Sequence, residues 1–394
     1  MANALMTTYA SLPVAFERGE GAWLWDDAGR KYLDAYSGVA VCNLGHAHPA
    51  LVRALSEQAG RLWHTSNVYT IANQIRLAER LTEVAGMDRA FFCNSGAEAN
   101  EAGIKLARLY GHKKGIDHPQ IIVMERSFHG RTLATLSATG NRKVQAGFEP
   151  LVTGFIRVPY DDLEAVRTVA HNAHGIVAVL VEPVQGEGGV RVPQPGYLKG
   201  LREICDQHGW LLMFDEVQTG MGRTGQWFGF QHEDVAPDVL MLAKGIGNGF
   251  PMGACLARGE AAEVFQPGNH ATTFGGTPLA CAVGLAVLDV MQQDNLIPRV
   301  AQLGARMLDG LKRELAEVAG VTEIRGKGLM LGIELERPCG ELVKRALDQG
   351  LLLGVTYDNT VRLLPPFVLT DAEADDIVSR VSALVRAFLT EEAA

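Results

Sequence analysis

Lys244 is the first residue whose position suggests chemistry, because it ends the apolar run "PDVLMLA" and is followed at once by Gly245. Lysine is almost never fully buried without a partner, and burial lowers the pKa of its amine by up to ~3–5 units. A neutral amine is a nucleophile that can form a Schiff base with an aldehyde. Lys244 is therefore a candidate nucleophile. The alternative is a lysine that reaches solvent or pairs with an acid.

Asp215 ends another apolar run, "GWLLMFD". A buried carboxylate must be paired, because an isolated buried charge is costly. The alternatives to a functional role are a salt bridge and a helix N-cap. The spacing between Asp215 and Lys244 corresponds to one strand–helix–strand step, which predicts that both residues lie at the ends of adjacent strands.

The segment Asn94–Ala97 follows the run "FFC" and opens a predicted helix that extends to about Gly111. Small residues such as Ser95, Gly96 and Ala97 at a helix N-terminus let backbone N–H groups approach a phosphate. The alternative is ordinary N-capping by Ser95.

Together these three features match what pyridoxal phosphate (PLP) needs from a protein. Its phosphate needs an anion site, its pyridinium nitrogen needs a carboxylate, and its aldehyde needs a lysine. The segment "SFHGRT" adds Phe128, which could stack on the pyridine ring, and Arg131, which could clamp a substrate carboxylate. The alternatives are a core phenylalanine and a surface arginine in an ion pair.

Further polar residues stand close to predicted strands and turns. Glu182 and Glu187 lie in "VEPVQGEGGV", directly after a buried run. Arg362 lies in "VRLLPP", an apolar setting that suggests a partner or ligand for its charge. Thr272 and Thr273 precede a Gly-Gly turn and offer two hydroxyls to a phosphate.

The elements that would position these residues belong to an α/β protein. Short apolar runs separated by helix-length segments fit strands buried on both faces of a mostly parallel sheet. Ligands of such sheets bind beyond the carboxyl ends of the strands, where Asp215 and Lys244 are expected. The predicted strands are Ala90–Cys93, Ile121–Met124, Ile176–Val181, Trp210–Phe214, Val239–Leu242 and Gly253–Leu256.

The two ends of the chain have a different pattern. A hairpin is predicted near the start, and a helix that begins with a Thr370–Glu373 capping box closes the chain. The other predicted elements here are strands at Trp23–Trp25, Tyr32–Leu33, Gly328–Leu335 and Val361–Leu364, and helices at Val300–Val318 and Gly340–Gly350. We therefore predict a large domain of residues 51–295 and a small α/β domain that combines residues 1–50 with residues 296–394.

Composition limits the class of protein. The 394-residue chain carries a net charge of -9 and 47% hydrophobic residues, which suits a globular protein and argues against a nucleic-acid partner. No apolar run is long enough to span a membrane, and no targeting segment is apparent. The six cysteines are far apart, and His46 and His48 have no third ligand nearby, so we expect reduced thiols and no metal site. A cytoplasmic enzyme is expected.

Five motifs, taken together, are specific for one family: "NSGAEANE", "FHGRT", "EPVQGEGG", "FDEVQTGMGRTG" and "LAKGIGNGFPMGA". The sequence resembles the class III (ornithine/acetylornithine) aminotransferases over nearly its whole length. The resemblance implies the type I PLP-dependent transferase fold, with a mostly parallel seven-stranded sheet. It also implies a homodimer whose active site is shared across the interface, and a reaction that moves the terminal amine of N-acetylornithine to 2-oxoglutarate.

The resemblance further implies a role for each matching residue. Lys244 would bond to the cofactor aldehyde and shuttle a proton, and Asp215 would pair with the pyridinium nitrogen. Glu182 would support the network beside the ring. The remaining cofactor contacts would be ring packing by Val217 and Phe128, a hydrogen bond from Gln218 to the ring hydroxyl, and phosphate binding by Ser95, Gly96, Ala97 and, from the second subunit, Thr273.

The implied substrate contacts are divided between two arginines. Arg131, with Thr272 close by, would hold the carboxylate of N-acetylornithine, and Arg362 would hold the α-carboxylate of 2-oxoglutarate. Glu187 would neutralise Arg362 when the amine donor is bound. The donor reacts at its terminal amine, whereas 2-oxoglutarate reacts next to its carboxylate. A movable Glu187–Arg362 pair would therefore hide and expose a cation as each substrate requires.

The choice of donor is left open by the sequence. Ornithine aminotransferases carry a tyrosine where this chain has Val39, and an aliphatic residue favours an N-acylated donor over free ornithine. N-succinylornithine, N-succinyl-diaminopimelate and 4-aminobutyrate are alternative donors. An aminomutase would share the fold and the lysine, but would not depend on 2-oxoglutarate. A non-catalytic PLP-binding protein is disfavoured by the presence of Lys244, Asp215 and Arg131.

Overall fold

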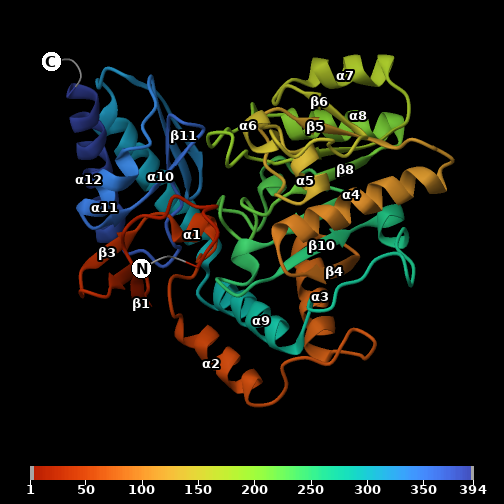
Figure 1. The fold of residues 1–394 in the computed structure, drawn as a ribbon, viewed down its shortest axis with the longest axis horizontal. Coiled ribbons are helices and arrows are strands. Elements are labelled where there is room, and N and C mark those ends of the chain that lie inside the picture. Colours follow the sequence, from red (N-terminus) through yellow and green to blue (C-terminus); the bar gives the residue numbers. More distant parts are fainter. Residues whose placement is uncertain (1–3, 392–394) are drawn as a thin grey trace.

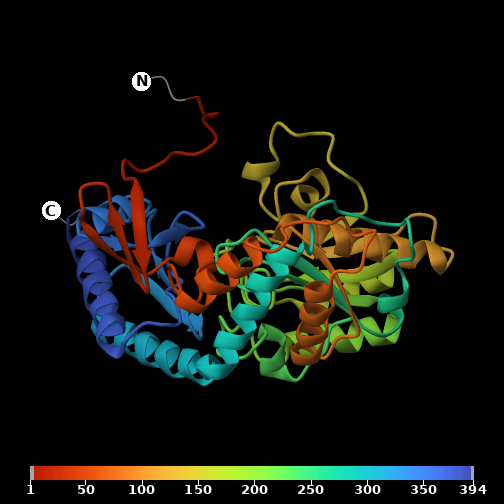
Figure 2. The same cartoon turned by 90° about the horizontal axis from the view of Figure 1, so that it is seen from below.

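A computed structural model describes residues 4–391 of the chain. The first three and last three residues of the predicted small domain therefore lie outside the described residues. The fold has a large part built on a seven-stranded sheet and a smaller part built on two four-stranded sheets (Figure 1). The extended segment before the first strand runs out from the smaller part (Figure 2).

The seven-stranded sheet has the order β4-β10-β9-β8-β7-β5-β6. Only β10 runs antiparallel to its neighbours, so the predicted mostly parallel sheet is confirmed. The edge strand β6 was missed by the sequence analysis, because it is only partly buried and carries an exposed Arg157. The strands are β4 (Arg89–Cys93), β5 (Gln120–Met124), β6 (Phe155–Val158), β7 (Ile176–Val181), β8 (Leu211–Asp215), β9 (Val239–Leu242) and β10 (Gly253–Ala257).

Both faces of this sheet are buried, which explains why its strands are continuous apolar runs. In β7, Val179 and Val181 pack into one core cluster, whereas Ala178 and Leu180 pack into the other. Helix α4 (Gly96–Lys113) covers one face, and α8 (Tyr197–His208), with α7 (Leu163–Asn172) beside it, covers the other. Helix α9 (Pro278–Gln293) packs against α2 (Pro49–Ala59) and α3 (Ala72–Ala85).

The smaller part combines both ends of the chain, as predicted. One sheet has the order β1-β2-β3-β13, and the other has the order β11-β12-β15-β14. The C-terminal strand β13 pairs with the N-terminal strand β3, so neither end completes this sheet alone. These strands are β1 (Phe16–Glu20), β2 (Trp23–Asp26), β3 (Lys31–Asp34), β11 (Val321–Lys327), β12 (Met330–Leu335), β13 (Leu351–Leu352), β14 (Gly354–Thr356) and β15 (Thr360–Leu363). The exact domain limits remain a prediction.

Two long helices, α10 (Leu296–Leu315) and α12 (Asp371–Thr390), pack together beside the second of these sheets, and α11 (Leu342–Asp348) packs on α12 (Figure 1). Short helices complete the chain: α1 (Ser37–Ala40), α5 (Leu133–Ala138), α6 (Arg142–Gln145), η1 (Gly229–Glu233), η2 (Lys244–Ile246) and η3 (Gly259–Glu263). Among residues 4–391, no helix is both long and apolar enough to cross a membrane.

The connection between β8 and β9 differs from the predicted strand–helix–strand step. It contains only the short 3-10 helix η1. Glycines and left-handed backbone at Met221, Gly222 and Gly225 prevent a helix from forming in the preceding segment. The buried Glu216 carboxylate instead organises the connection, because it accepts hydrogen bonds from the backbone N–H of Gly229 at 2.7 Å and of Phe230 at 2.9 Å.

The capping box of α12 is confirmed and yields a stability prediction. Thr370 Oγ1 accepts from the N–H of Glu373 at 3.2 Å, and Glu373 Oε2 accepts from the N–H of Thr370 at 2.9 Å. Thr370→Ala should lower the free energy of unfolding by about 1 kcal/mol, because one N-terminal N–H of the helix loses its acceptor. The control is Ser379→Ala, an exposed position on the same helix. Equal unfolding midpoints in urea for the two variants would contradict this prediction.

Candidate active site

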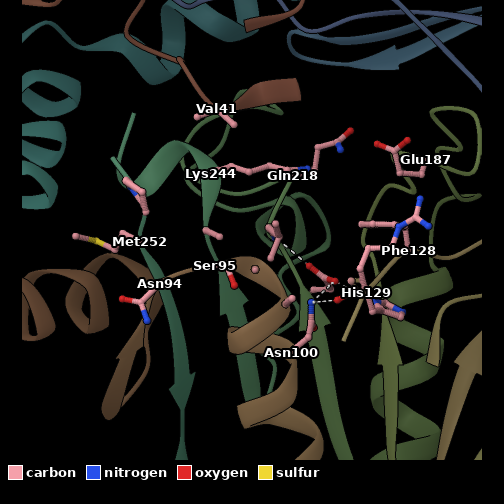
Figure 3. Close-up of a pocket in the computed structure, with 18 of the residues that line it drawn as sticks. Val41, Asn94, Ser95, Asn100, Phe128, His129, Glu187, Gln218, Lys244 and Met252 are labelled. Atoms are coloured by element: carbon pink, nitrogen blue, oxygen red, sulfur yellow. Dashed lines mark hydrogen bonds and ion pairs between the residues drawn. The ribbon is translucent and has the colours of Figure 1, made fainter. Parts of the chain in front are cut away.

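A cavity of about 390 Å³ lies at the carboxyl ends of β8 and β9, next to the smaller part of the molecule (Figure 3). This is the place where parallel α/β sheets bind their ligands. It brings together most of the residues that the sequence singled out. Those that line it are Ser95, Gly96, Ala97, Phe128, Arg131, Glu182, Glu187, Asp215, Val217, Gln218 and Lys244.

Lys244 stands two residues beyond the end of β9, and its backbone is left-handed with φ +51°. A left-handed non-glycine residue is strained and is often found at functional sites. Gly245 lets the backbone beside Lys244 pass close to Asn43, because a Cβ at this position would collide with the Asn43 side chain. Burial lowers the pKa of the Lys244 amine, although the charge of Glu187 works in the opposite direction. Within residues 4–391, the Lys244 amine forms no hydrogen bond or ion pair.

Asp215 ends β8, directly beside β9, and its carboxylate is buried. Its Oδ2 accepts from Asn100 Nδ2 at 2.8 Å and lies 2.8 Å from His129 Nδ1, while its Oδ1 accepts from the N–H of Val217 at 3.0 Å. The dashed lines in Figure 3 mark contacts of this network. Three partners fix the carboxylate and compensate its burial. His129 stands in the "SFHGRT" segment but could not be given a role from the sequence, and Asn100 was not predicted.

The phosphate-ready segment is the first turn of α4. Ser95 caps this helix, since its Oγ accepts from the N–H of Glu98 at 3.2 Å. The alternative of ordinary N-capping is therefore present in the structure. The N–H groups of Gly96 and Ala97 have no acceptor within the helix, as in any first helical turn, and both residues line the cavity. A Cβ on Gly96 would come 2.7 Å from Val217 Cγ1, so only glycine fits there without movement.

Arg362 and Glu187 form an ion pair across the two parts of the molecule. Arg362 Nη1 lies 2.6 Å from Glu187 Oε1. The Arg362 side chain is only 2% exposed, whereas that of Glu187 is 35% exposed. Burial alone would raise the pKa of the Glu187 carboxyl, but the charge and hydrogen bond of Arg362 outweigh it and lower the pKa. Arg362 also donates to Gln218 Oε1 at 3.4 Å and to the Tyr36 hydroxyl at 3.3 Å.

Arg131 differs from Arg362 in being exposed at the cavity wall. Its guanidinium lies 5.7 Å from the centre of the Phe128 ring. Within the described chain it has no acidic partner at ion-pair distance, so the alternative of a surface ion pair is not found. A cation that is accessible and without a counter-ion is available to a carboxylate ligand.

Glu182 is buried behind Phe128 and the loop that carries Glu187. Its Oε1 accepts from the N–H of Phe128 at 3.0 Å, and its Oε2 accepts from the N–H of Gly186 at 3.1 Å. Burial raises the pKa of the Glu182 carboxyl to about 7, against the opposing charge of His129. Glu182 therefore ties two walls of the cavity together.

Thr272 and Thr273 lie elsewhere within a single chain. They line a separate cavity of about 760 Å³, and Thr272 Oγ1 accepts from Asn94 Nδ2 at 3.3 Å. The predicted proximity of Thr272 to Arg131 is therefore not found inside one chain. Val39 also does not line the cavity at Lys244; it packs beside Tyr36 in a small apolar cluster.

Val41, two residues further along the chain, does line the cavity at Lys244 (Figure 3). His46, which was weighed as a metal ligand, lies instead 2.8 Å from Asp34 Oδ2. Among the described residues, no group of three or more His, Cys, Asp or Glu side chains could hold a metal ion.

The contact between Asn100 and Asp215 can be tested by charge. Asn100→Asp replaces an amide nitrogen 2.8 Å from Asp215 Oδ2 with a carboxylate oxygen. Two carboxylates this close cannot both ionise freely, so the folded protein holds a proton that the unfolded chain releases above about pH 4. Folding stability should then fall as pH rises from 5 to 8.

Asn100→Ala is the matched control, since it removes the donor without adding charge. It should lose roughly 1–3 kcal/mol with a much weaker pH dependence. The measurement is the urea unfolding midpoint of both variants at pH 5 and pH 8. Equal losses at the two pH values for Asn100→Asp would contradict the predicted repulsion.

Comparison with known proteins agrees with this geometry. Residues 5–385 match the family model described as aminotransferase class-III. The chain is 62% identical over 385 residues to the acetylornithine aminotransferase of Nitrosomonas europaea, with 98% of each chain covered. It is 54% identical over 392 residues to acetylornithine aminotransferase 1 of Bordetella bronchiseptica, with 100% of each chain covered.

Solved structures show the same fold. The ornithine aminotransferase of Toxoplasma gondii superposes with a TM-score of 0.95 at 36% identity, covering 98% of this chain and 94% of that one. The acetylornithine aminotransferase of Elizabethkingia anophelis superposes with a TM-score of 0.86 at 38% identity, covering 96% and 95%. From the arrangement of Lys244, Asp215 and the two arginines, and from these matches, we conclude that the chain belongs to the class III aminotransferases.

Proposed function

We propose that the cavity at Lys244 binds PLP and catalyses transamination between an amine donor and 2-oxoglutarate. The observation that carries the proposal is the Lys244 amine, unpaired among the residues that the structure describes, in the same cavity as a fixed, buried carboxylate and the start of a long helix. These three groups have the chemistry that the aldehyde, the pyridine nitrogen and the phosphate of PLP require. The lysine, the carboxylate and the helix start that line this cavity therefore fit the cofactor.

The residues that would hold the cofactor follow from their places in the cavity. Lys244 would bond to the aldehyde, Asp215 would accept from the ring nitrogen, and the first turn of α4 (Ser95, Gly96 and Ala97) would bind the phosphate. Phe128 and Val217 would pack on the two ring faces, and Gln218 would contact the ring hydroxyl. When bound, the cofactor supplies a ring that accepts electrons from the substrate carbon.

The protein's own groups would supply the proton transfer. The lowered pKa of the Lys244 amine favours its neutral form, which can take a proton from the substrate carbon. Asp215 would present its carboxyl group to the ring nitrogen in a fixed orientation, because Asn100, His129 and Val217 hold it in place. Glu182 would support the ring side of the site by holding the backbone of Phe128, whose N–H donates to Glu182 Oε1.

The proposed substrates are N-acetylornithine and 2-oxoglutarate, which would give N-acetylglutamate 5-semialdehyde and glutamate. The names of the relatives at 62% and 54% identity support this donor. Arg131 would hold the carboxylate of N-acetylornithine, and Arg362 would hold the α-carboxylate of 2-oxoglutarate. Free ornithine is the second candidate donor, because the Toxoplasma gondii ornithine aminotransferase has so similar a fold.

The Glu187–Arg362 pair would act as a gate between the two substrates. While Glu187 is paired with Arg362, the guanidinium charge is neutralised and is not presented to the carbon chain of the bound amine donor. A dicarboxylate brings its own negative charge and would replace Glu187, whose side chain is partly exposed and would turn toward solvent. Exchanging one carboxylate partner for another avoids leaving the buried Arg362 unpaired, which would be costly.

A second copy of the chain would complete the site. Thr273 is exposed and does not line its own Lys244 cavity, so its proposed contact with phosphate, and that of Thr272 with substrate, would be made across a homodimer interface. Large exposed apolar side chains around this region support such an interface. They include Trp63, Val68, Tyr69 and Phe274. The cytoplasmic location remains a prediction.

The cofactor assignment has a direct test in Lys244→Ala. Wild-type protein purified with PLP should be yellow and should retain cofactor after borohydride reduction, whereas Lys244→Ala should retain none. Its kcat should fall by at least roughly 10²–10⁴-fold, because the proton-transfer group is lost. Lys199→Ala, at an exposed lysine on α8, is the control and should behave as wild type. Retention of reduced cofactor by Lys244→Ala would refute the assignment.

The donor assignment is tested by kcat/KM for N-acetylornithine, ornithine, N-succinylornithine, N-succinyl-diaminopimelate and 4-aminobutyrate, each with 2-oxoglutarate. N-acetylornithine should be preferred over ornithine by about 10-fold or more, because an apolar wall at Val41 offers no partner to a free α-amino group. Omitting 2-oxoglutarate is the control, since an aminomutase would remain active without it. A preference for free ornithine would overturn this donor.

A further inference from the structure

Arg362 belongs to a row of paired residues that crosses the whole β11-β12-β15-β14 sheet. Arg325 on β11 pairs with Gly332 on β12, Gly332 pairs with Arg362 on β15, and Arg362 pairs with Gly354 on β14. Directly paired residues point to the same face of a sheet. Two arginines therefore stand on one face, with a glycine between them and a glycine beyond them.

The loop that carries Glu187 lies on this row. Its base is closed by Gln185 and Arg191, whose backbones exchange two hydrogen bonds of 3.0 Å. A Cβ on Gly332 would come 2.9 Å from Val190 Cβ, so this glycine gives the loop room to sit on the sheet. Val190 is fully buried and left-handed with φ +51°, which is a rare and strained state for a β-branched residue. Such a turn persists only where its surroundings hold it.

Arg325 supplies the contacts that hold the turn. Its Nε donates to Val190 O at 2.9 Å, and its Nη2 donates to Gly189 O at 2.5 Å. Its Nη1 pairs with Glu323 at 2.6 Å and with Glu334 at 2.5 Å, so the buried charge is compensated. A planar guanidinium can satisfy two adjacent carbonyls and two carboxylates at once, which a lysine ammonium cannot.

A second anchor fixes the backbone of Glu187 itself. Thr356 Oγ1, on β14, donates to Glu187 O at 2.7 Å. The backbone around Glu187 is thus tied to the same sheet that carries Arg362, while the Glu187 side chain remains partly exposed. The contacts therefore fix the backbone of Glu187 and leave its side chain partly open to solvent.

We propose that Arg325 is a positioning residue that holds the Glu187 loop against the sheet and thereby sets how often Arg362 is covered. The inference rests on the proposed Glu187–Arg362 gate. Without the Arg325 contacts, the strained turn relaxes, Glu187 pairs with Arg362 less often, and Arg362 is available to a carboxylate ligand for more of the time. The enzyme then loses discrimination between its two substrates, and its chemical step is otherwise unaffected.

The test uses Arg325→Lys and Arg325→Gln in the PLP-loaded enzyme. The dissociation constant of glutarate, an unreactive dicarboxylate, should fall roughly 5-fold, the lower end of the usual range for coupled sites. In single-turnover measurements, the donor half-reaction should slow relative to the 2-oxoglutarate half-reaction. This ratio is read within one sample, so a partly unfolded variant still reports it. Glu323→Gln is the control, because it changes the same network but leaves both loop carbonyls bonded; it should leave the ratio unchanged.

A double-mutant cycle tests the role of Arg325 separately from the proposed Glu187–Arg362 gate. Glu187→Gln alone should shift glutarate binding and the half-reaction ratio in the same direction, and adding Arg325→Lys should then change neither further. If Glu187→Gln shifts both but the Arg325 variants shift neither, or slow both half-reactions equally, the role of Arg325 is overturned. If Glu187→Gln itself shifts neither, the proposed gate fails.

Discussion

A partly buried lysine amine, which has no hydrogen-bond or ion-pair partner among residues 4–391, is the constraint on which the rest of the site depends. Burial lowers the pKa of the Lys244 amine because it disfavours the charged form. The nearby charges then add to this lowering or oppose it. Glu187 and Asp215 favour the ammonium, whereas Arg362 disfavours it. Each of these groups must therefore be fixed in turn. The hydrogen-bond network around Asp215 and the loop contacts around Glu187 serve that need.

The two parts of the molecule each hold some of the charged groups that surround Lys244. The parallel sheet of the large part delivers Asp215 and Lys244 from neighbouring strand ends. The β11-β12-β15-β14 sheet of the smaller part carries Arg362, which forms an ion pair with Glu187 of the large part. An ion pair between two parts of a molecule can be exchanged for a ligand more easily than one inside a core, since one partner already reaches solvent. The proposed alternation between two substrates makes use of this difference in exposure between Glu187 and Arg362.

The sequence predicted the features that have a local signal. Lys244 and Asp215 could be found because a charged residue at the end of an apolar run is unusual, and the α12 capping box has a fixed spacing. Asn100 and Arg325 could not be found, since their roles arise from contacts with distant segments, and backbone carbonyls such as those of Gly189 and Val190 have no sequence signature.

Other differences have the same origin. The partly exposed edge strand β6 lacks the continuous apolar run of its neighbours. The connection from β8 to β9 contains glycine turns where a helix was predicted. Val39 and Val41 are too close in sequence for a motif to decide which one faces the cavity.

The most direct measurement follows the nitrogen. N-acetylornithine labelled with ¹⁵N at its terminal amine would be incubated with the enzyme and 2-oxoglutarate, and the products analysed by mass spectrometry. The account predicts that the label appears in glutamate, and that it does so only when both substrates and an intact Lys244 are present. Label retained in the donor, or released as ammonia, would contradict the claim that one site takes both substrates in turn.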